Sequence, residues 1–206
     1  MLRRLRFKVV CDLRTAREQH HHPDLLPADG SIRLLLLPIQ AGNFDPDIAM
    51  DRLRSGERDW LSLDFFIRLY RQYLDDFGPV WGRVLRLVAA PANLPLVFHC
   101  TGGKDRTGIC ATLLLLALGV GEDDIFLDHD LSNACNAERL QPIYARFAEF
   151  GIGPEEAAPY LQAPREPLAA MLAHLRTSYG TVDNYLLTKA GLDETVLAAL
   201  RSHLLE

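Results

Sequence analysis

One short segment holds the residues with the clearest chemical potential. Cys100 follows an apolar run, and Arg106 comes six residues later. Gly102 and Gly103 lie between them and let the backbone come close to a bound group. A thiolate that faces a guanidinium and the start of a helix should have a strongly lowered pKa and be ionised at neutral pH. The spacing therefore predicts a nucleophilic cysteine beside a site for an anion.

Residues 96–108 form a pattern typical of a strand, a tight loop and a helix. Such a loop turns backbone N–H groups toward one point, and the helix start adds positive potential there. Arg106 can hold two phosphate oxygens in a bidentate fork. The chemistry indicated is attack of the Cys100 sulfur on phosphorus, which forms a phosphocysteine. We expect Thr107 to donate a hydrogen bond to the sulfur, and the phosphate to be bound by Thr101, Gly102, Gly103, Lys104 and Thr107.

Other interpretations of this segment carry less weight. A nucleotide-binding phosphate loop needs a glycine separated by four residues from its Gly-Lys pair, and Ser or Thr after the pair, but Phe98 and Asp105 stand there. A buried cysteine at a strand end is the plainer alternative for Cys100. The Cys-x5-Arg spacing is much more specific than a lone cysteine, and it favours catalysis. We expect His99 to orient the loop through backbone contacts.

Protonation of the leaving group needs an acid within reach of the departing oxygen. Asp45 and Asp47 follow the second expected strand on a loop, and Asp105 lies beside the phosphate site itself. The acidic pair at 75–76 ends a helical pattern, which is a poor position for a mobile acid. Asp105, Asp45 and Asp47 therefore stay as candidates. A purely structural role for Asp105, such as pairing with Arg14, is compatible with catalysis.

The elements that must position this segment are three apolar strands at 7–11, 33–38 and 96–99. Apolar residues three or four apart predict a helix over 60–76, Pro79 opens another that continues through Val88, and residues 106–118 form a third. After Gly121 we expect only several short helices, with breaks near 151–154, 164–167, 180 and 191. The predicted fold is α/β, with a small, mostly parallel central sheet flanked by helices and an all-helical C-terminal part.

The composition of the chain disfavours some classes of function and location. The chain has 206 residues, 49% of them hydrophobic, and its 22 Lys and Arg against 27 Asp and Glu give a net charge of −5. We expect a single domain over 1–206, with an α/β core at about 1–121 and a helical elaboration at about 122–206. The acidic balance disfavours a nucleic-acid partner. No stretch is long and apolar enough to cross a bilayer, and we expect a cytoplasmic protein. The oligomeric state stays open.

The segment His99–Gly108 resembles the His-Cys-x5-Arg-Ser/Thr-Gly signature of the cysteine-based protein tyrosine phosphatase superfamily. Its Gly-Lys-Asp-Arg-Thr-Gly form is similar to a narrower group, the bacterial and fungal tyrosine/dual-specificity phosphatases. The resemblance continues in Asp12-Leu13-Arg14 with Glu18, in residues 118–133 and in residues 179–201. An upstream segment with an Asn-Phe-Arg-Asp-type motif usually precedes these elements in the group, and it has no counterpart in this sequence.

The resemblance implies a phosphatase that hydrolyses phosphomonoesters through a phosphocysteine intermediate, without a metal or organic cofactor. Phosphotyrosine is the expected substrate, with phosphoserine, phosphothreonine or a phosphoinositide as further options, so the partner is a phosphorylated protein or phospholipid. It also favours Asp105 as the acid. Lys104 either contacts a second phosphate, as in lipid-active members, or strengthens the potential of the loop.

Two alternative functions remain at this point. One is a catalytically weak phosphate-binding relative with a regulatory role. The other is a thiol redox or arsenate-reducing enzyme, which needs a second cysteine near Cys100. Only Cys11, at the end of the first expected strand, is available for that pairing, and a buried core role for Cys11 is the better prediction.

Overall fold

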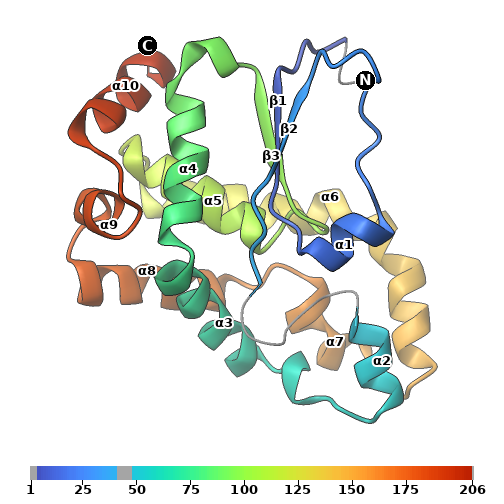
Figure 1. Ribbon diagram of the computed structural model, residues 1–206. Helices are drawn as coiled ribbons and strands as arrows, with labels where there is room; N and C mark the ends of the chain where they lie inside the picture. Colours follow the sequence, from blue (N-terminus) through green and yellow to red (C-terminus); the bar gives the residue numbers. More distant parts are fainter. Residues whose placement is uncertain (1–3, 41–47, 206) are drawn as a thin grey trace.

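The computed structural model describes residues 4–40 and 48–205 and contains a three-stranded parallel sheet (Figure 1). The strands are β1 (Val9–Asp12), β2 (Arg33–Leu36) and β3 (Leu96–His99), in the order β2-β1-β3. The central strand β1 is buried along its whole length and pairs with both neighbours. The predicted parallel sheet is confirmed, and the three carboxyl ends lie at one edge of it.

Helices make up most of the rest of the described chain. The expected helix at 60–76 is divided, because Ser62 caps the longer part by accepting a hydrogen bond from the Phe65 N–H. Pro79 lies in the first turn of its helix, and Gly119, with φ of 82°, follows the helix that starts at Arg106. The helices are α1 (Ala16–His21), α2 (Ala49–Arg54), α3 (Leu63–Asp76), α4 (Gly78–Ala89), α5 (Arg106–Ala117), α6 (Glu122–Ala148), α7 (Pro154–Leu161), α8 (Arg165–Tyr179), α9 (Val182–Thr188) and α10 (Glu194–Leu204), with 3₁₀ turns η2 (Asp59–Leu61) and η3 (Pro91–Asn93).

The expectation that only short helices follow Gly121 was wrong for one element. Helix α6 runs for 27 residues and includes Pro142. Proline usually ends a helix, and only Ile125, His129 and Phe147 of α6 are buried, so the sequence shows no continuous apolar stripe. The breaks expected further on are confirmed: Gly151, Gly180 and Gly191 all have positive φ.

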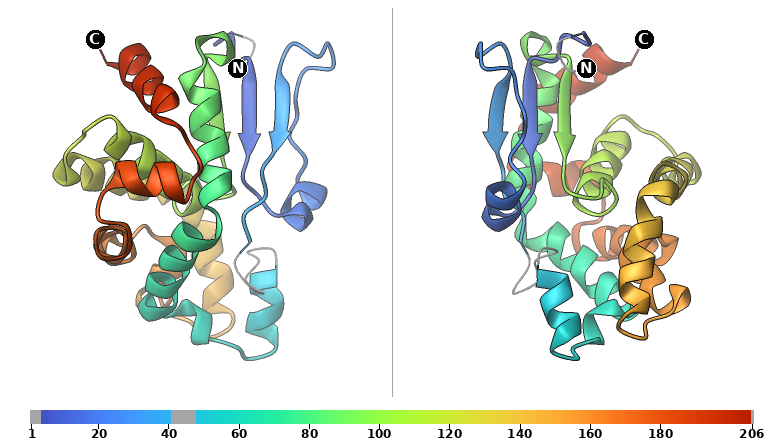
Figure 2. Two further views of the ribbon diagram at one scale, coloured as in Figure 1. Left: turned by 60° about the vertical axis from the view of Figure 1, so that its left-hand side comes forward. Right: turned by 90° about the vertical axis from the view of Figure 1, so that its right-hand side faces the viewer.

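The helices form two groups around the sheet. Helices α4 and α5 pack on each other beside it, with α10 against α4 and α9 against α5, and α5 also contacts β3. Helix α8 lies along α3, and together with α7 they form a layer below the carboxyl ends of the strands (Figures 1 and 2). Helix α10, the last helix of the chain, lies toward the opposite, amino-terminal ends of the strands (Figure 1). The carboxyl edge of the sheet therefore faces a helical layer.

Buried side chains from the whole chain form one core. The cluster joins Cys11 of β1 to Trp60, to Leu113 of α5 and to Leu172 of α8. The segment after residue 121 thus shares its apolar core with the α/β part. Among the described residues, no helix combines the length and the apolar character that a membrane span requires.

Candidate active site

The segment predicted to carry the chemistry lies at the carboxyl edge of the sheet, between β3 and α5. β3 ends at His99, and α5 begins at Arg106 after a loop in which Gly103 has φ of 73°. A residue with a side chain is strained in that conformation, so the turn favours glycine. Cys100 is buried to about nine tenths and lines a cavity of about 250 Å³. Thr101, Gly102, Lys104, Asp105 and Arg106 line the same cavity.

The loop offers unused hydrogen-bond donors. Among the described residues, no acceptor pairs with the backbone N–H groups of residues 101–105. The first N–H groups of an α-helix also lack partners inside the helix, and they carry a partial positive charge. The loop and the start of α5 thus offer unpaired donors and a partial positive charge, which are the features that an anion site requires.

Two side chains hold the Cys100 end of the loop. The Thr107 hydroxyl donates a hydrogen bond to the Cys100 Sγ at 3.2 Å, which confirms the predicted contact. The Nδ1 atom of His99 lies 3.1 Å from the Cys100 carbonyl oxygen, and its Nε2 atom lies 3.3 Å from Asp24. His99 therefore contacts the loop backbone, as expected.

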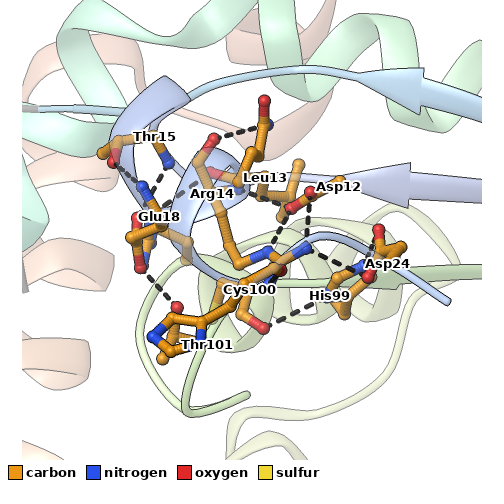
Figure 3. Close-up of polar contacts among 12 residues, drawn as sticks. Asp12, Leu13, Arg14, Thr15, Glu18, Asp24, His99, Cys100 and Thr101 are labelled. Carbon is orange, nitrogen blue, oxygen red and sulfur yellow. Dashed lines mark hydrogen bonds and ion pairs between the residues drawn. The ribbon is translucent and has the colours of Figure 1, made fainter. Parts of the chain in front are cut away.

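The strongest contact of Arg106 is a buried, bidentate pair with Glu18. Nη1 donates to Glu18 Oε2 at 2.7 Å and Nη2 donates to Oε1 at 2.8 Å. The Thr101 hydroxyl and the Thr15 N–H also donate to this carboxylate (Figure 3). Burial alone raises the pKa of Glu18, but the hydrogen bonds and charge of Arg106, with the Thr101 and Thr15 donors, lower it to about 2. Glu18 is therefore an anion at neutral pH, and it fixes the orientation of the arginine.

This pairing leaves one edge of the guanidinium free. Arg106 has five N–H groups, and Nη1 also lies 3.3 Å from the Leu13 carbonyl oxygen and 3.5 Å from that of Ile39. The Nε–H and the second Nη2–H have no acceptor among the described residues, and they point along the same edge. That edge matches two oxygens of one phosphate group.

A second charged cluster lies on the other side of the loop. Arg14 donates two hydrogen bonds to Asp12, each at 2.9 Å, and one to Asp24 at 3.0 Å, and Asp24 in turn contacts His99 (Figure 3). The predicted alternative pairing of Arg14 with Asp105 was wrong, because Asp12 and Asp24 already neutralise Arg14. Asp12, Asp24 and His99 lie close enough together to ligate a cation. The Arg14 guanidinium supplies the positive charge there instead.

Asp105 is held by two donors on one of its oxygens. The Tyr70 hydroxyl and the Lys104 ammonium group both donate to Oδ1, each at 2.8 Å. The Lys104 ammonium also lies 4.9 Å from the centre of the Phe66 ring. Oδ2 of Asp105 has no hydrogen-bond partner among the described residues. Asp45 and Asp47, the other candidate acids, lie outside the described residues.

The other cysteines near the sheet are core residues. Cys11 and Cys110 are both fully buried, and all four cysteines are free thiols. Burial raises the pKa of Cys11 to about 11, and it raises that of Cys110 still further. Both are therefore poor nucleophiles, and the prediction of a core role for Cys11 is confirmed.

A separate hollow lies behind the loop. It has a volume of about 350 Å³ and is lined by α5, α6 and the loop glycines. Gly103 and Thr107 border this hollow rather than the cavity over Cys100. Cys100 and Arg106 do not border it, so it is not the place where the predicted chemistry occurs.

Sequence reasoning did not assign roles to four residues that shape the site. Glu18 and Tyr70 hold Arg106 and Asp105. On α6, Asn136 donates to the Gly102 carbonyl at 3.1 Å and Arg139 donates to the Thr101 carbonyl at 3.0 Å. Glu18 had a local signal, because Thr15-x-x-Glu18 is a capping box at the start of α1. The other three show no comparable pattern.

Comparison with known proteins agrees with this geometry. A family model described as "Tyrosine phosphatase family" matches residues 1–206. The chain belongs to the tyrosine phosphatase family. It is thus a hydrolase of the protein-tyrosine-phosphatase type, and Cys100 lies in a loop consistent with the signature of that family.

Three relatives in the tyrosine phosphatase family align over nearly the whole chain. A Cupriavidus necator protein, itself classed as a candidate tyrosine-protein phosphatase, is 32% identical over 204 residues, covering 99% of this chain and 72% of its own length. A Nostoc commune tyrosine-protein phosphatase is 28% identical, covering 96% and 66%. The triple specificity protein phosphatase PtpB of Mycobacterium tuberculosis is 30% identical, covering 99% and 84%.

Proposed function

We propose that this phosphatase hydrolyses phosphotyrosine through a covalent phosphocysteine at Cys100. The observation that carries the proposal is that Cys100 and Arg106, which keeps two N–H groups unpaired within the described part of the chain, line the same cavity. The N–H groups of residues 101–105, in the loop that carries Cys100, have no acceptor among the described residues. Together they would hold three phosphate oxygens and leave phosphorus facing the sulfur.

In the first step, the Cys100 sulfur attacks phosphorus while the bond from phosphorus to the substrate oxygen breaks. Arg106 and the loop amides stabilise the equatorial oxygens, which gain charge in the transition state. Asp105 protonates the departing oxygen. Because Oδ1 already accepts from Tyr70 and Lys104, the proton is carried on Oδ2.

In the second step, water attacks the phosphocysteine and the thiolate leaves. Asp105, now ionised, takes a proton from that water. The Thr107 hydroxyl, 3.2 Å from the sulfur, stabilises the charge that returns to the thiolate. The cycle consumes one water and releases inorganic phosphate, and Cys100 returns to its starting thiolate state.

The thiol redox alternative has less support. Its resolving cysteine would be Cys11, whose pKa is raised to about 11 by burial and which is packed in the core. A thiol in that state exchanges slowly with disulfides. Phosphate binding alone requires neither an acid at Asp105 nor a hydrogen bond from Thr107 to the Cys100 sulfur.

The test is hydrolysis of p-nitrophenyl phosphate and a phosphotyrosine peptide by the wild type and by Cys100→Ser. We expect the variant to lose at least about a thousandfold in kcat. Cys135→Ser is the matched control, because Cys135 is exposed and outside the cavity over Cys100, and it should keep wild-type rates. Turnover that survives Cys100→Ser would overturn the proposal. Because PtpB is named a triple specificity phosphatase, phosphoserine, phosphothreonine and phosphoinositide substrates belong in the same series.

A further inference from the structure

Two arginines of α6 line the cavity that contains Cys100. Arg139 and Arg146 are both exposed, and they are seven residues apart, which places them two turns or roughly 10 Å apart along the helix. Arg139 donates only to the Thr101 carbonyl. Arg146 forms no hydrogen bond or ion pair with the described part of the chain. Neither guanidinium thus has an anionic partner there.

The other cations of the cavity are already paired. Arg106 is compensated by Glu18 and Lys104 by Asp105. Asp105 is the one acidic residue among the described residues that line the cavity. Within the described part of the chain, the positive charge at the cavity that lacks an acidic partner therefore comes from α6, in a protein whose net charge is −5. A substrate that carries negative charge beyond its reacting phosphate would be attracted there.

The wall between the two arginines is apolar. Leu140, Ile143 and Phe147 of α6 line it, together with Tyr160 of α7 and Met50 of α2. An aromatic ring gains by burial against such a surface. The hydroxyl groups of an inositol ring would lose water against Leu140, Ile143 and Phe147, whose side chains offer no hydrogen bonds, which is unfavourable. The wall favours a phosphotyrosine ring over an inositol headgroup.

We propose that this cavity selects phosphotyrosine peptides with an acidic side chain about three residues from the phosphotyrosine, read by Arg146 with help from Arg139. In this arrangement the phosphotyrosine backbone lies beside Arg139, which donates to the Thr101 carbonyl of the loop. An extended peptide advances about 3.3 Å per residue, so a side chain three residues away comes opposite Arg146, roughly 10 Å along α6. This inference rests on the proposed function and specifies its substrate class. Arg146 is a specificity residue, not a catalytic one.

The experiment compares phosphotyrosine peptides that differ only by Glu or Gln, placed three residues before or three residues after the phosphotyrosine. We expect kcat/KM of the wild type to favour Glu about threefold at low salt in at least one placement, and the preference to shrink as salt is added. Arg146→Gln should bring that ratio close to one. Arg71→Gln, at an exposed position on α3 outside the cavity, is the matched control and should keep the ratio.

Other results of this experiment would overturn either the inference alone or the proposed function as well. Equal rates for Glu and Gln peptides in the wild type, or a preference that survives Arg146→Gln, would overturn the inference but leave the proposed function in place. The inference is also wrong if Arg146→Gln slows hydrolysis of phosphatidylcholine vesicles containing a phosphatidylinositol monophosphate while the peptide ratio is unchanged. If no peptide is hydrolysed in a Cys100-dependent way, the proposed function is overturned as well.

Discussion

The buried pair between Glu18 and Arg106 makes a quantitative prediction for Glu18→Gln. The Glu18 side chain is 1% exposed, and its pKa falls from 4.5 to about 2 on folding. A carboxyl with that change contributes about 3 kcal/mol to the free energy of unfolding at pH 7. Glutamine keeps the size of the side chain but leaves the Arg106 charge without its anion. We therefore expect the variant to be about 3 kcal/mol less stable at pH 7, in the range for breaking a buried pair.

The pH dependence follows from the direction of the shift. Because folding lowers the pKa of Glu18, its contribution is complete above about pH 4.5 and is lost as the pH falls toward 2. The stability difference between wild type and Glu18→Gln should accordingly decrease to about half near pH 3. Urea unfolding of both proteins at pH 7, 4 and 3 measures this difference, and the other carboxyl groups cancel in the comparison.

Glu57→Gln is the matched control, since Glu57 forms an exposed pair with Arg52 and should change stability little. Loss of the Glu18 anchor should also lower kcat/KM toward p-nitrophenyl phosphate, because Arg106 is no longer held in one orientation. A stability difference below about 1 kcal/mol at pH 7 would refute the reasoning. So would a difference that does not shrink in acid.

Three further predictions concern the site and its support. Asp105→Asn should flatten the acidic side of the rate–pH profile for an aryl phosphate with a poor leaving group, and an unchanged profile would exclude Asp105 as the acid. Thr107→Val should lower kcat about tenfold through the lost hydrogen bond to the catalytic sulfur, whereas Thr107→Ser should keep most of the activity; stopped-flow kinetics that show equal losses would contradict this role. Gly82→Ala places a methyl group against the Ala190 carbonyl and should cost about 1–3 kcal/mol in thermal unfolding. Gly121→Ala, in open space at the N-cap of α6, should cost less than about 1 kcal/mol. Equal stabilities of those two variants would show that α4 is not packed closely there.

Local patterns were sufficient to predict the nucleophilic segment. The strand 96–99, the loop glycines and the helix start at Arg106 are all encoded within about a dozen residues, and they formed as expected. The contacts of Thr107 and His99 were also predicted, because both residues are near Cys100 in sequence. The two other strands were found from their apolar runs, within two residues at each end.

The residues that orient the catalytic groups could not be found in this way. Glu18 reaches Arg106 across 88 positions, and Tyr70 reaches Asp105 across 35. Such contacts depend on how α1 and α3 pack against the loop, which no local pattern reveals. For Arg14, a contact was expected that the structure does not contain. It was a possible partner of Asp105, but its side chain pairs with the carboxylates of Asp12 and Asp24 instead.

Helix α6 was misjudged for a different reason. Proline usually ends a helix, but α6 continues through Pro142. Because few residues of α6 are buried, its sequence has no apolar stripe that would indicate one long helix. The consequence for function is considerable, because α6 supplies Asn136 and Arg139 to the loop backbone and Arg146 to the cavity.

Direct detection of the phosphocysteine is the measurement closest to the central claim. The enzyme is mixed with a phosphotyrosine peptide, quenched within milliseconds and digested, and the peptide that contains Cys100 is analysed by mass spectrometry. The proposed mechanism predicts one added phosphoryl group on Cys100, which accumulates during turnover and is absent from Cys100→Ser. Rapid turnover with unmodified Cys100, or with the phosphoryl group on another residue, would contradict it.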